Sequence, residues 1–309
     1  MSPSTALLCV VLVILALLLA VLVAASRRAM PTQRASAHGG ATDWWDTPVD
    51  PAARTAIRRY AQRSIIPSLQ GRDRAPFDKG LRAALRDDGA RHSNLAGLGK
   101  FLLRSKLASS GAGRGESGRA SVRAEEIVDI LPPDAAGPYL DLGCGDGTIT
   151  KAVSASLGCQ AACIEVGPRP RGFPKTIRRV DAAKTAALGD GEFGVVTALM
   201  SLHHIPEPEA AAKELARVTR PGGTLVVREH SLDDCPGEMR PEVARQYLDW
   251  IHIMYDLAEG LEPSQFQRSM YQTPAGWSAL LAEAGFAEQD IARRQGDRVC
   301  SYYATYRRE

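Results

Sequence analysis

Charged side chains are absent from the start of this 309-residue chain. Residues 1–26 contain no Asp, Glu, Lys or Arg, and residues 6–25 form an unbroken apolar run. A helix of that length spans about 30 Å, the thickness of a bilayer core. No basic residue precedes the run, which is also longer than the apolar core of a signal peptide, at about 7–15 residues. We therefore expect a retained membrane anchor, with a cleaved signal peptide as the alternative.

Paired cysteine spacing is also missing from the chain. One cysteine lies in the apolar run, and the other five form no CxxC pattern; they are Cys144, Cys159, Cys163, Cys235 and Cys300. Cys159 and Cys163 are four residues apart, but no histidine or second cysteine pair accompanies them to complete a zinc-binding pattern. We expect reduced thiols and no metal site.

Acidic residues are scarce in residues 27–120, which carry 18 Lys and Arg against eight Asp and Glu. Arg27, Arg28 and Arg34 closely follow the apolar run. The positive-inside rule therefore predicts a single-pass membrane protein whose long C-terminal part lies in the cytoplasm. Few aromatic residues are interleaved with the basic ones, which argues against a nucleic-acid partner.

Two segments of this basic region show helical spacing of their apolar residues. Residues 51–69 place Ala53, Ile57 and Ile65 on one face, and residues 94–107 do the same with four leucines: Leu95, Leu98, Leu102 and Leu103. The first helix could bind anionic lipid headgroups, or pack against the main domain with a solvated charged face. The second could cover an active site or pack on the core.

The remaining residues, 121–309, are acidic, with 20 Lys and Arg against 27 Asp and Glu. After a linker at 109–118 and a helix at 121–131, strand-like runs alternate with helical ones; the strands are predicted at 139–142, 161–166, 194–199, 224–228 and 299–306. This alternation predicts an α/β domain with a mostly parallel sheet. We divide the chain into an anchor at 1–26, a basic juxtamembrane and linker region with short helices at 27–120, and a catalytic domain at 121–309.

The first predicted strand runs into a glycine-rich turn and the start of a helix, YLDLGCGDGTIT. Glycines at 143, 145 and 147 let the backbone approach a ligand closely beyond the carboxyl end of a strand. The dinucleotide-binding pattern has Gly or Ala where Thr148 stands. The carboxylate of Asp141 would repel a pyrophosphate and suit a ligand with positive charge. S-adenosylmethionine carries a sulfonium and an ammonium group and has no phosphate.

The segment Asp-Leu-Gly-Cys-Gly-Asp-Gly after a strand resembles motif I of the class I S-adenosylmethionine-dependent methyltransferases. The segment RVTRPGGTLVVR resembles the turn before the fifth strand in the ubiquinone and menaquinone biosynthesis group, also known as methyltransferase type 11. The resemblance covers about residues 121–306. It implies a Rossmann-like α/β fold with a mostly parallel seven-stranded sheet flanked by helices, and S-adenosyl-L-methionine as cofactor.

The same resemblance implies which residues contact the cofactor. They are Asp141, Gly143, Cys144, Gly145, Gly147, Glu165, Asp181, Ala182 and Leu199. Glu165 matches the acidic residue that binds the ribose hydroxyls in this family, and Asp181 matches the position that reaches the adenine amino group. Gly194 departs from the family pattern, which has Asp at this position. The run Arg228-Glu229-His230 also resembles a branch of the family found in large DNA viruses, although Ser231 stands where Asp is expected.

No catalytic residue follows from the motifs alone. Methyl transfer depends mainly on orientation of the reacting atoms, and a general base is needed only when the nucleophile must lose a proton. His203 and His204 at the end of the fourth strand and His230 after the fifth are the candidates, with His252 and Tyr255 in the next segment. We also expect part of the apolar run around Tyr247 to Leu257, with Phe266, Met270 and Tyr271, to form the wall of an acceptor pocket.

The sequence is compatible with three functions. The first is methyl transfer to a small-molecule or lipid-like acceptor at a membrane surface. The second is methyl transfer to a protein or RNA, which the basic region favours and the acidic domain opposes. The third is a non-catalytic cofactor-binding pseudoenzyme, suggested by Gly194 and the lack of a clear base. The oligomeric state is not predicted.

Overall fold

The computed structural model describes residues 44–86, 90–105, 116–166, 169–235, 239–293 and 298–309. The predicted anchor at residues 6–25 lies outside this part of the chain, so it stays a prediction. Among the helices that the structure describes, none is long and apolar enough to cross a membrane. Residues Trp44–Glu309 form one compact unit.

A single sheet organises the C-terminal part of the described chain. Its strands run in the order β3-β2-β1-β4-β5-β7-β6; they are β1 (Tyr139–Leu142), β2 (Ala161–Glu165), β3 (Ile177–Asp181), β4 (Phe193–Leu199), β5 (Thr219–His230), β6 (Phe286–Arg293) and β7 (Ser301–Arg308). The first five strands pair in parallel, and β7 is antiparallel to both of its neighbours. The predicted seven-stranded, mostly parallel α/β fold is confirmed.

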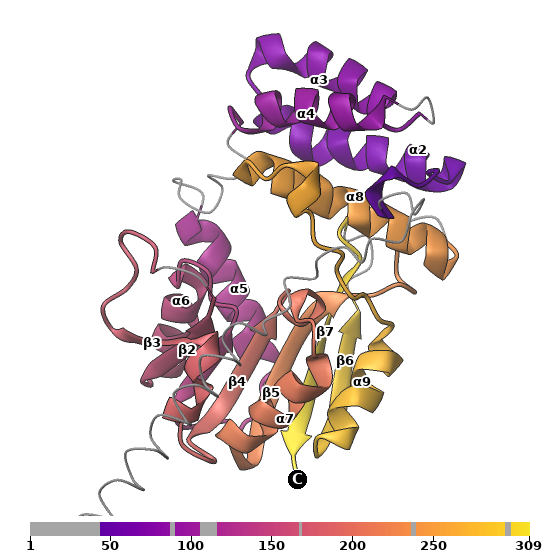
Figure 1. The fold of residues 1–309 in the computed structure, drawn as a ribbon. Helices are drawn as coiled ribbons and strands as arrows, with labels where there is room; N and C mark the ends of the chain where they lie inside the picture. The colour runs from indigo at the N-terminus through magenta and orange to yellow at the C-terminus, as the bar shows by residue number, and fades with distance from the viewer. Residues whose placement is uncertain (1–43, 87–89, 106–115, 167–168, 236–238, 294–297) are drawn as a thin grey trace, which may run out of the picture. The chain divides into compact units, whose positions relative to one another are not determined.

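Helices cover both faces of this sheet (Figure 1). They are α5 (Glu116–Ile130) and α6 (Thr148–Leu157) on one face and α7 (Pro208–Val218) and α9 (Pro274–Glu283) on the other. Successive side chains of β1 point to opposite faces of the sheet: Tyr139 packs on the α5/α6 side and Leu140 on the α7/α9 side. Burial on both faces explains why strands such as FGVVTAL are almost wholly apolar.

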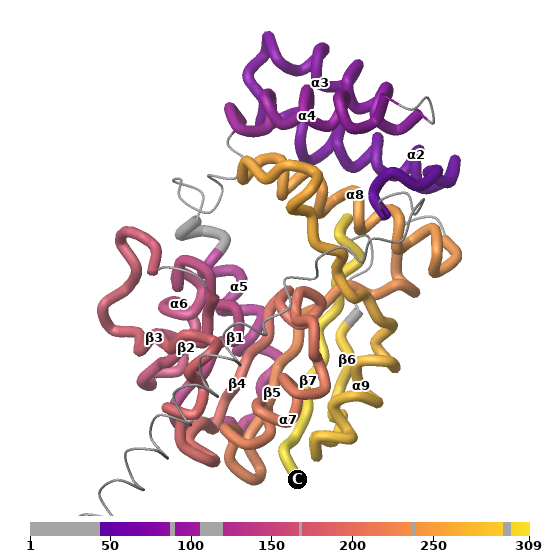
Figure 2. The backbone as a smooth tube through the Cα atoms, viewed as in Figure 1, coloured from indigo at the N-terminus to yellow at the C-terminus, as the bar shows by residue number. Residues whose placement is uncertain are grey.

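A second hydrophobic core lies among helices that precede the first strand and helices that lie between β5 and β6. The helices are α2 (Pro51–Tyr60), α3 (Gly71–Ala84), α4 (Arg91–Leu102) and α8 (Pro241–Glu259), with short turns η1 (Trp44–Asp46), η2 (Ala61–Ile65), η3 (Ile66–Ser68) and η7 (Pro263–Gln265). Figure 2 shows α2 and α4 running beside α8. The predicted apolar face of residues 51–69 packs here, with Ile57 and Ile65 fully buried. That apolar face is therefore covered by protein; Arg59 and Arg63 are exposed, whereas Arg54 and Arg58 are partly buried.

This core also takes most of the residues expected to form an acceptor wall. Tyr247, Trp250, Ile253, Met254 and Leu257 are all buried in this core. None of them lines the pocket at the glycine-rich loop described below, and Tyr247 instead lines a separate pocket of about 350 Å³ beside α2. Further members of the same core are Ile251, Phe266 and Tyr271, whereas Tyr255 is exposed. These buried residues therefore do not form the wall of the pocket at the glycine-rich loop, because the helices within residues 27–120 need an apolar partner.

The structure pairs four of the cysteines. Cys144 is bonded to Cys163, and Cys235 to Cys300, while Cys159 is free. The expectation of reduced thiols is therefore wrong for these four residues in this structure. Their spacing of 19 and 65 residues gave no signal, because each pair is brought together by neighbouring strands or loops rather than by a local motif.

Candidate functional site

The glycine-rich loop between β1 and α6 is shaped by three left-handed residues. Gly143, Gly145 and Gly147 have φ values of 78°, 54° and 78°. A Cβ atom at Gly143 would lie 2.6 Å from the Cβ of Ser201, and one at Gly147 would lie 2.9 Å from Phe173. The loop therefore needs glycine for its backbone conformation and also for close packing against the exit of β4.

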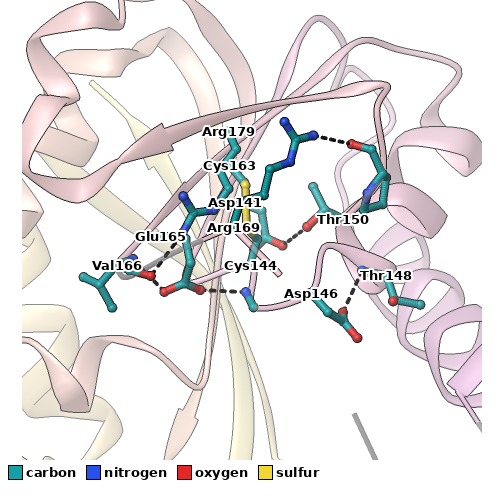
Figure 3. Close-up of a disulfide and its surroundings, with 12 residues drawn as sticks. Asp141, Cys144, Asp146, Thr148, Thr150, Cys163, Glu165, Val166, Arg169 and Arg179 are labelled. Atoms are coloured by element: carbon teal, nitrogen blue, oxygen red, sulfur yellow. Dashed lines mark hydrogen bonds between the residues drawn. A yellow bond between two sulfur atoms is a disulfide. The ribbon is translucent and has the colours of Figure 1, made fainter. Parts of the chain in front are cut away.

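The carboxylate of Asp141 points into the interior of the domain. It accepts hydrogen bonds from Thr150 Oγ1 at 2.6 Å and Thr197 Oγ1 at 2.8 Å, and Figure 3 shows it beside Thr150. Burial raises the pKa of Asp141 to about 6, although the two hydroxyl donors oppose this shift. The structure therefore places Asp141 beneath the glycine loop, among hydroxyl groups, and not among the residues that line the pocket described next.

A pocket of about 610 Å³ lies at the carboxyl ends of β1, β2 and β4. It brings together three of the predicted cofactor residues: Gly143, Glu165 and Ala182. Its other lining residues are Leu142, Ile164, Val166, Thr185, Met200, Ser201, His204, Ile205, Pro206, Ala211, Glu214 and Leu215. The crevice beyond the carboxyl ends of parallel strands is where open α/β sheets bind their ligands.

Glu165 ties the second strand to the glycine loop. Its Oε2 accepts a hydrogen bond from the Gly145 N–H at 2.7 Å, and its Oε1 accepts one from the Val166 N–H at 2.7 Å. The disulfide between Cys144 and Cys163 joins the same two segments (Figure 3). Glu165, predicted to bind the ribose hydroxyls, thus lies at the pocket edge with its carboxylate fixed by backbone donors.

Asp181 ends β3 and caps the short helical turn η5 (Ala182–Ala187). Its Oδ1 accepts a hydrogen bond from the Ala183 N–H at 2.9 Å. This cap positions Ala182 and Thr185 on the pocket wall, while Asp181 itself is not among the lining residues.

At the exit of β4 the pocket is lined by Met200 rather than by Leu199. Met200 has φ of 58°, and its N–H donates to the Arg228 carbonyl at 2.6 Å. A left-handed conformation is uncommon for a side chain of this size and is usually retained where a functional site requires it. Leu199 packs with the core on the α5/α6 side.

Four histidines from distant parts of the chain meet next to the pocket. His203 and His204 lie on the turn η6 (Leu202–His204), His230 ends β5, and His252 lies on α8. The ring centroid of His203 lies 4.1 Å from that of His204, 4.8 Å from His230 and 5.1 Å from His252. His204 also lines the pocket. The three histidines predicted as catalytic candidates are therefore brought together.

Glu229 is the buried carboxyl group of this histidine cluster, and the sequence motifs include it only as part of the run Arg228-Glu229-His230, without a role in the site. It accepts hydrogen bonds from the backbone N–H groups of Ser201 at 3.0 Å and Leu202 at 2.8 Å, and lies 2.5 Å from His203 Nδ1. Burial raises the pKa of Glu229 to about 7. Burial also lowers the pKa of His203 and His230 well below the usual range and lowers that of His204. The histidine rings are therefore neutral near pH 7.

Gly194, the departure from the expected pattern, has a local structural cause. A Cβ atom at this position would lie 1.9 Å from the Ala136 carbonyl oxygen and 2.9 Å from the Arg220 guanidinium carbon. The N–H of Gly194 donates to the Pro138 carbonyl at 3.0 Å. The segment before β1 thus passes so close to β4 that only glycine fits, and the departure concerns packing at the amino end of β4, away from the pocket.

Comparison with known proteins agrees with this geometry. The family model described as methyltransferase domain matches residues 117–289, more than half of the chain. The chain belongs to this family. It carries a class I S-adenosylmethionine-dependent methyltransferase domain, and S-adenosylmethionine is the cofactor. The pocket at the glycine loop, with a carboxylate at Glu165 and a backbone edge at Ala182, suits a ligand of this kind.

The names of several similar proteins state small-molecule substrates. The 2-methyl-6-phytyl-1,4-hydroquinone methyltransferase of Synechocystis is 30% identical over 55% of this chain and 58% of its own length. The sarcosine/dimethylglycine N-methyltransferase of Halorhodospira halochloris is 27% identical over 59% of this chain and 68% of its own. The chain thus spans less than two thirds of the first relative. Among solved structures, a SAM dependent methyltransferase from Aquifex aeolicus aligns with a TM-score of 0.45 and 14% identity, over 65% of this chain and 97% of that one.

Proposed function

We propose that this methyltransferase transfers a methyl group from S-adenosylmethionine to a small, apolar, quinol-type acceptor. The observation that carries the proposal is the pocket that joins the glycine loop, at Gly143 and Glu165, to the exit of β4, at Met200 and His204. Apolar side chains such as Ile205 and Leu215 complete its wall. The printed name of the Synechocystis relative supports a quinol acceptor.

Methyl transfer in this pocket depends mainly on the alignment of the acceptor with the methyl group of the cofactor. The methyl carbon is already activated by the sulfonium, so holding the acceptor oxygen about 3–3.5 Å away in line supplies most of the rate. A quinol hydroxyl must also lose its proton. His204 lines the pocket, and burial lowers its pKa, so its neutral imidazole is available to accept that proton. His203 and His230 are buried behind it and would position its ring.

A membrane location forms part of the same proposal. Residues 6–25 would anchor the chain as a single-pass protein, with the methyltransferase domain in the cytoplasm and an acceptor drawn from the bilayer. Arg59 and Arg63 are exposed around α2 and would face lipid headgroups. Flotation of the full chain with anionic vesicles, compared with a chain lacking residues 1–43, tests this location. Equal flotation of the two chains would reject the anchor.

The acceptor is tested by following a labelled methyl group. The full chain is incubated with labelled S-adenosylmethionine and separate lipid, metabolite, protein and RNA fractions, and label in the quinol-containing lipid fraction is expected. Label in protein or RNA instead would replace this acceptor class with the alternative one. Absence of label in every fraction, with cofactor still bound, would indicate a pseudoenzyme.

Cofactor binding is tested separately by calorimetry with Glu165→Gln. We expect at least a tenfold loss of affinity, about 1.4 kcal/mol, because a carboxylate that accepts two hydrogen bonds from ribose binds more tightly than an amide. Glu283→Gln removes an exposed carboxylate at the end of α9 and serves as the matched control. Equal affinities in the two variants would remove Glu165 from the cofactor site.

A further inference from the structure

The histidine cluster beside the pocket has the composition and spacing of a metal site. Ligand atoms of His203, His204 and His252 all lie within 4.8 Å of one another. The Nε2 atoms of His203 and His252 are 3.2 Å apart. Two nitrogens bound to a tetrahedral zinc ion at about 2.0–2.1 Å lie about 3.3 Å from each other. The two histidines thus already hold the separation that a shared metal ion requires.

The far nitrogen of each ring faces a hydrogen-bond acceptor. His203 Nδ1 lies 2.5 Å from Glu229 Oε2, and His252 Nδ1 lies 2.9 Å from the Leu248 carbonyl oxygen. A carbonyl oxygen can only accept, so the bond to Leu248 forms when the His252 proton is on Nδ1. The hydroxyl of Tyr271 lies 2.8 Å from the same nitrogen and accepts in that tautomer or donates in the other one. In the tautomer with Nδ1 protonated in both rings, the two Nε2 lone pairs face each other and can bind one cation between them. When one of the two Nε2 atoms is protonated instead, the same 3.2 Å contact is a hydrogen bond between the two rings.

This arrangement also matches the surroundings of known metal-binding histidines. Such a histidine usually donates its second N–H to a carboxylate or a backbone carbonyl, which fixes its tautomer and orientation. Glu229 and Leu248 are acceptors of these two kinds. His204 is the exposed member of the cluster and lines the cofactor pocket, so the pocket gives a metal ion a route to the site.

We propose that His203, His204 and His252 bind one divalent transition-metal ion of the zinc class, with Glu229 orienting His203. Three imidazoles leave a fourth tetrahedral position open, as in catalytic zinc sites. Because His204 borders the pocket, that position could take water or an acceptor hydroxyl from it. The metal-bound His204 could not then act as the general base, and the ion would instead lower the pKa of the bound hydroxyl. This last use rests on the proposed methyl transfer, whereas metal binding itself does not.

The test uses the full chain without a polyhistidine tag, stripped with chelator and titrated with Co²⁺ alone. We expect one equivalent to bind with visible bands of tetrahedral cobalt and without the near-ultraviolet band of a cobalt thiolate, which excludes Cys159 as a ligand. Zn²⁺ should displace the cobalt and abolish the visible bands. Absence of saturable binding by the wild-type chain would overturn the proposal.

Variants locate the metal. His204→Ala removes an exposed side chain and should lower the affinity for Co²⁺ at least tenfold. Glu229→Gln keeps the size of the side chain and should lower it about 10–100-fold. His92→Ala removes an exposed histidine of α4 and should leave it unchanged. Unchanged affinity in both His204→Ala and Glu229→Gln would overturn the assignment, whatever the wild-type chain binds.

Calorimetry with S-adenosylmethionine on the same metal-stripped samples keeps this result apart from the proposed function. Cobalt binding without cofactor binding would count against methyl transfer but would support the metal site. Cofactor binding and label transfer without cobalt binding would support methyl transfer and overturn the metal site.

Discussion

Two constraints require glycine at position 143: the backbone is left-handed, and an added Cβ atom would be too close to Ser201. Gly143→Ala should therefore lower the free energy of unfolding by about 1–3 kcal/mol and weaken cofactor binding, because the loop must move to relieve the contact. Urea denaturation and calorimetry with S-adenosylmethionine measure the two effects. Gly97→Ala in α4, where a Cβ atom meets nothing and φ is ordinary, should leave stability equal or about 0.5–1 kcal/mol higher.

Gly145→Ala separates the two constraints. Gly145 also has positive φ, but no atom lies within 4 Å of its added Cβ. We expect it to cost only the backbone strain, about 1 kcal/mol, and so less than Gly143→Ala. Equal losses in the two variants would mean that the contact with Ser201 carries no energy.

Asp141 is expected to make stability depend on pH. Its pKa is raised from 3.8 to about 6 by burial, so the folded protein holds the proton more tightly than the unfolded chain. Its contribution is therefore fully present below pH 3.8 and is lost as the pH rises through about 6. The loss amounts to about 3 kcal/mol at most, since each pKa unit corresponds to about 1.4 kcal/mol.

The comparison with Asp141→Asn isolates this effect, because Asp249, which also has a pKa raised to about 6, is present in both proteins. The unfolding free energy of the wild-type chain should fall relative to the variant as the pH rises through about 6. Parallel pH profiles for the two proteins would contradict a buried Asp141 with a raised pKa.

At the scale of elements, α4 joins the helices of the basic region to α8. Leu98 is buried at 1% exposure against α3, and Leu103 at the end of the helix is 58% exposed. Leu98→Ala should cost about 2–5 kcal/mol, because a cavity is left in a closed core. Leu103→Ala should change stability by no more than about 0.5 kcal/mol. Chemical denaturation of both variants measures the difference, and similar losses would mean that Leu103 is also packed.

The elements that the sequence predicted well are those with a clear apolar period. β1 begins and ends where expected, and the apolar faces of α2 and α4 were correct except for Leu103, which is exposed. β3 and β6 were not predicted individually, because IRRVD and FAEQDIAR carry polar side chains at the edges of the sheet. α3 was missed because it contains two glycines and Pro76. α5 begins at Glu116, five residues before the expected cap at Ser121.

The residues of the candidate site also fall into two groups, those that local motifs predicted and those that they did not. Gly143 and Glu165 follow from local motifs at strand ends, and the structure places them in one pocket. Glu229 and its contact with His203 span 26 residues, and His203 and His252 are 49 residues apart. The first pair depends on the pairing of β4 with β5, and the second depends on where α8 lies relative to the turn after β4. No local periodicity in the sequence carries that information.

At the scale of the whole molecule, the methyltransferase domain shares its α8 with the helices of residues 44–105. The apolar side of α8 is buried by α2 and α4 and includes Tyr247, Trp250, Ile251 and Met254. The family model, by contrast, begins at residue 117 and would leave those helices out. The division of the chain after residue 120 stays a prediction, and two truncations test it.

A chain lacking residues 1–43 keeps the compact unit Trp44–Glu309, so it should not aggregate and should fold cooperatively. A chain lacking residues 1–115 exposes the apolar side of α8, and an uncovered patch of this kind drives association. We expect the shorter chain to aggregate or to bind a hydrophobic dye strongly, as measured by size-exclusion chromatography and dye fluorescence. A monomeric, dye-free chain of residues 116–309 would show instead that α8 needs no cover, and the boundary after residue 120 would then be a true domain boundary.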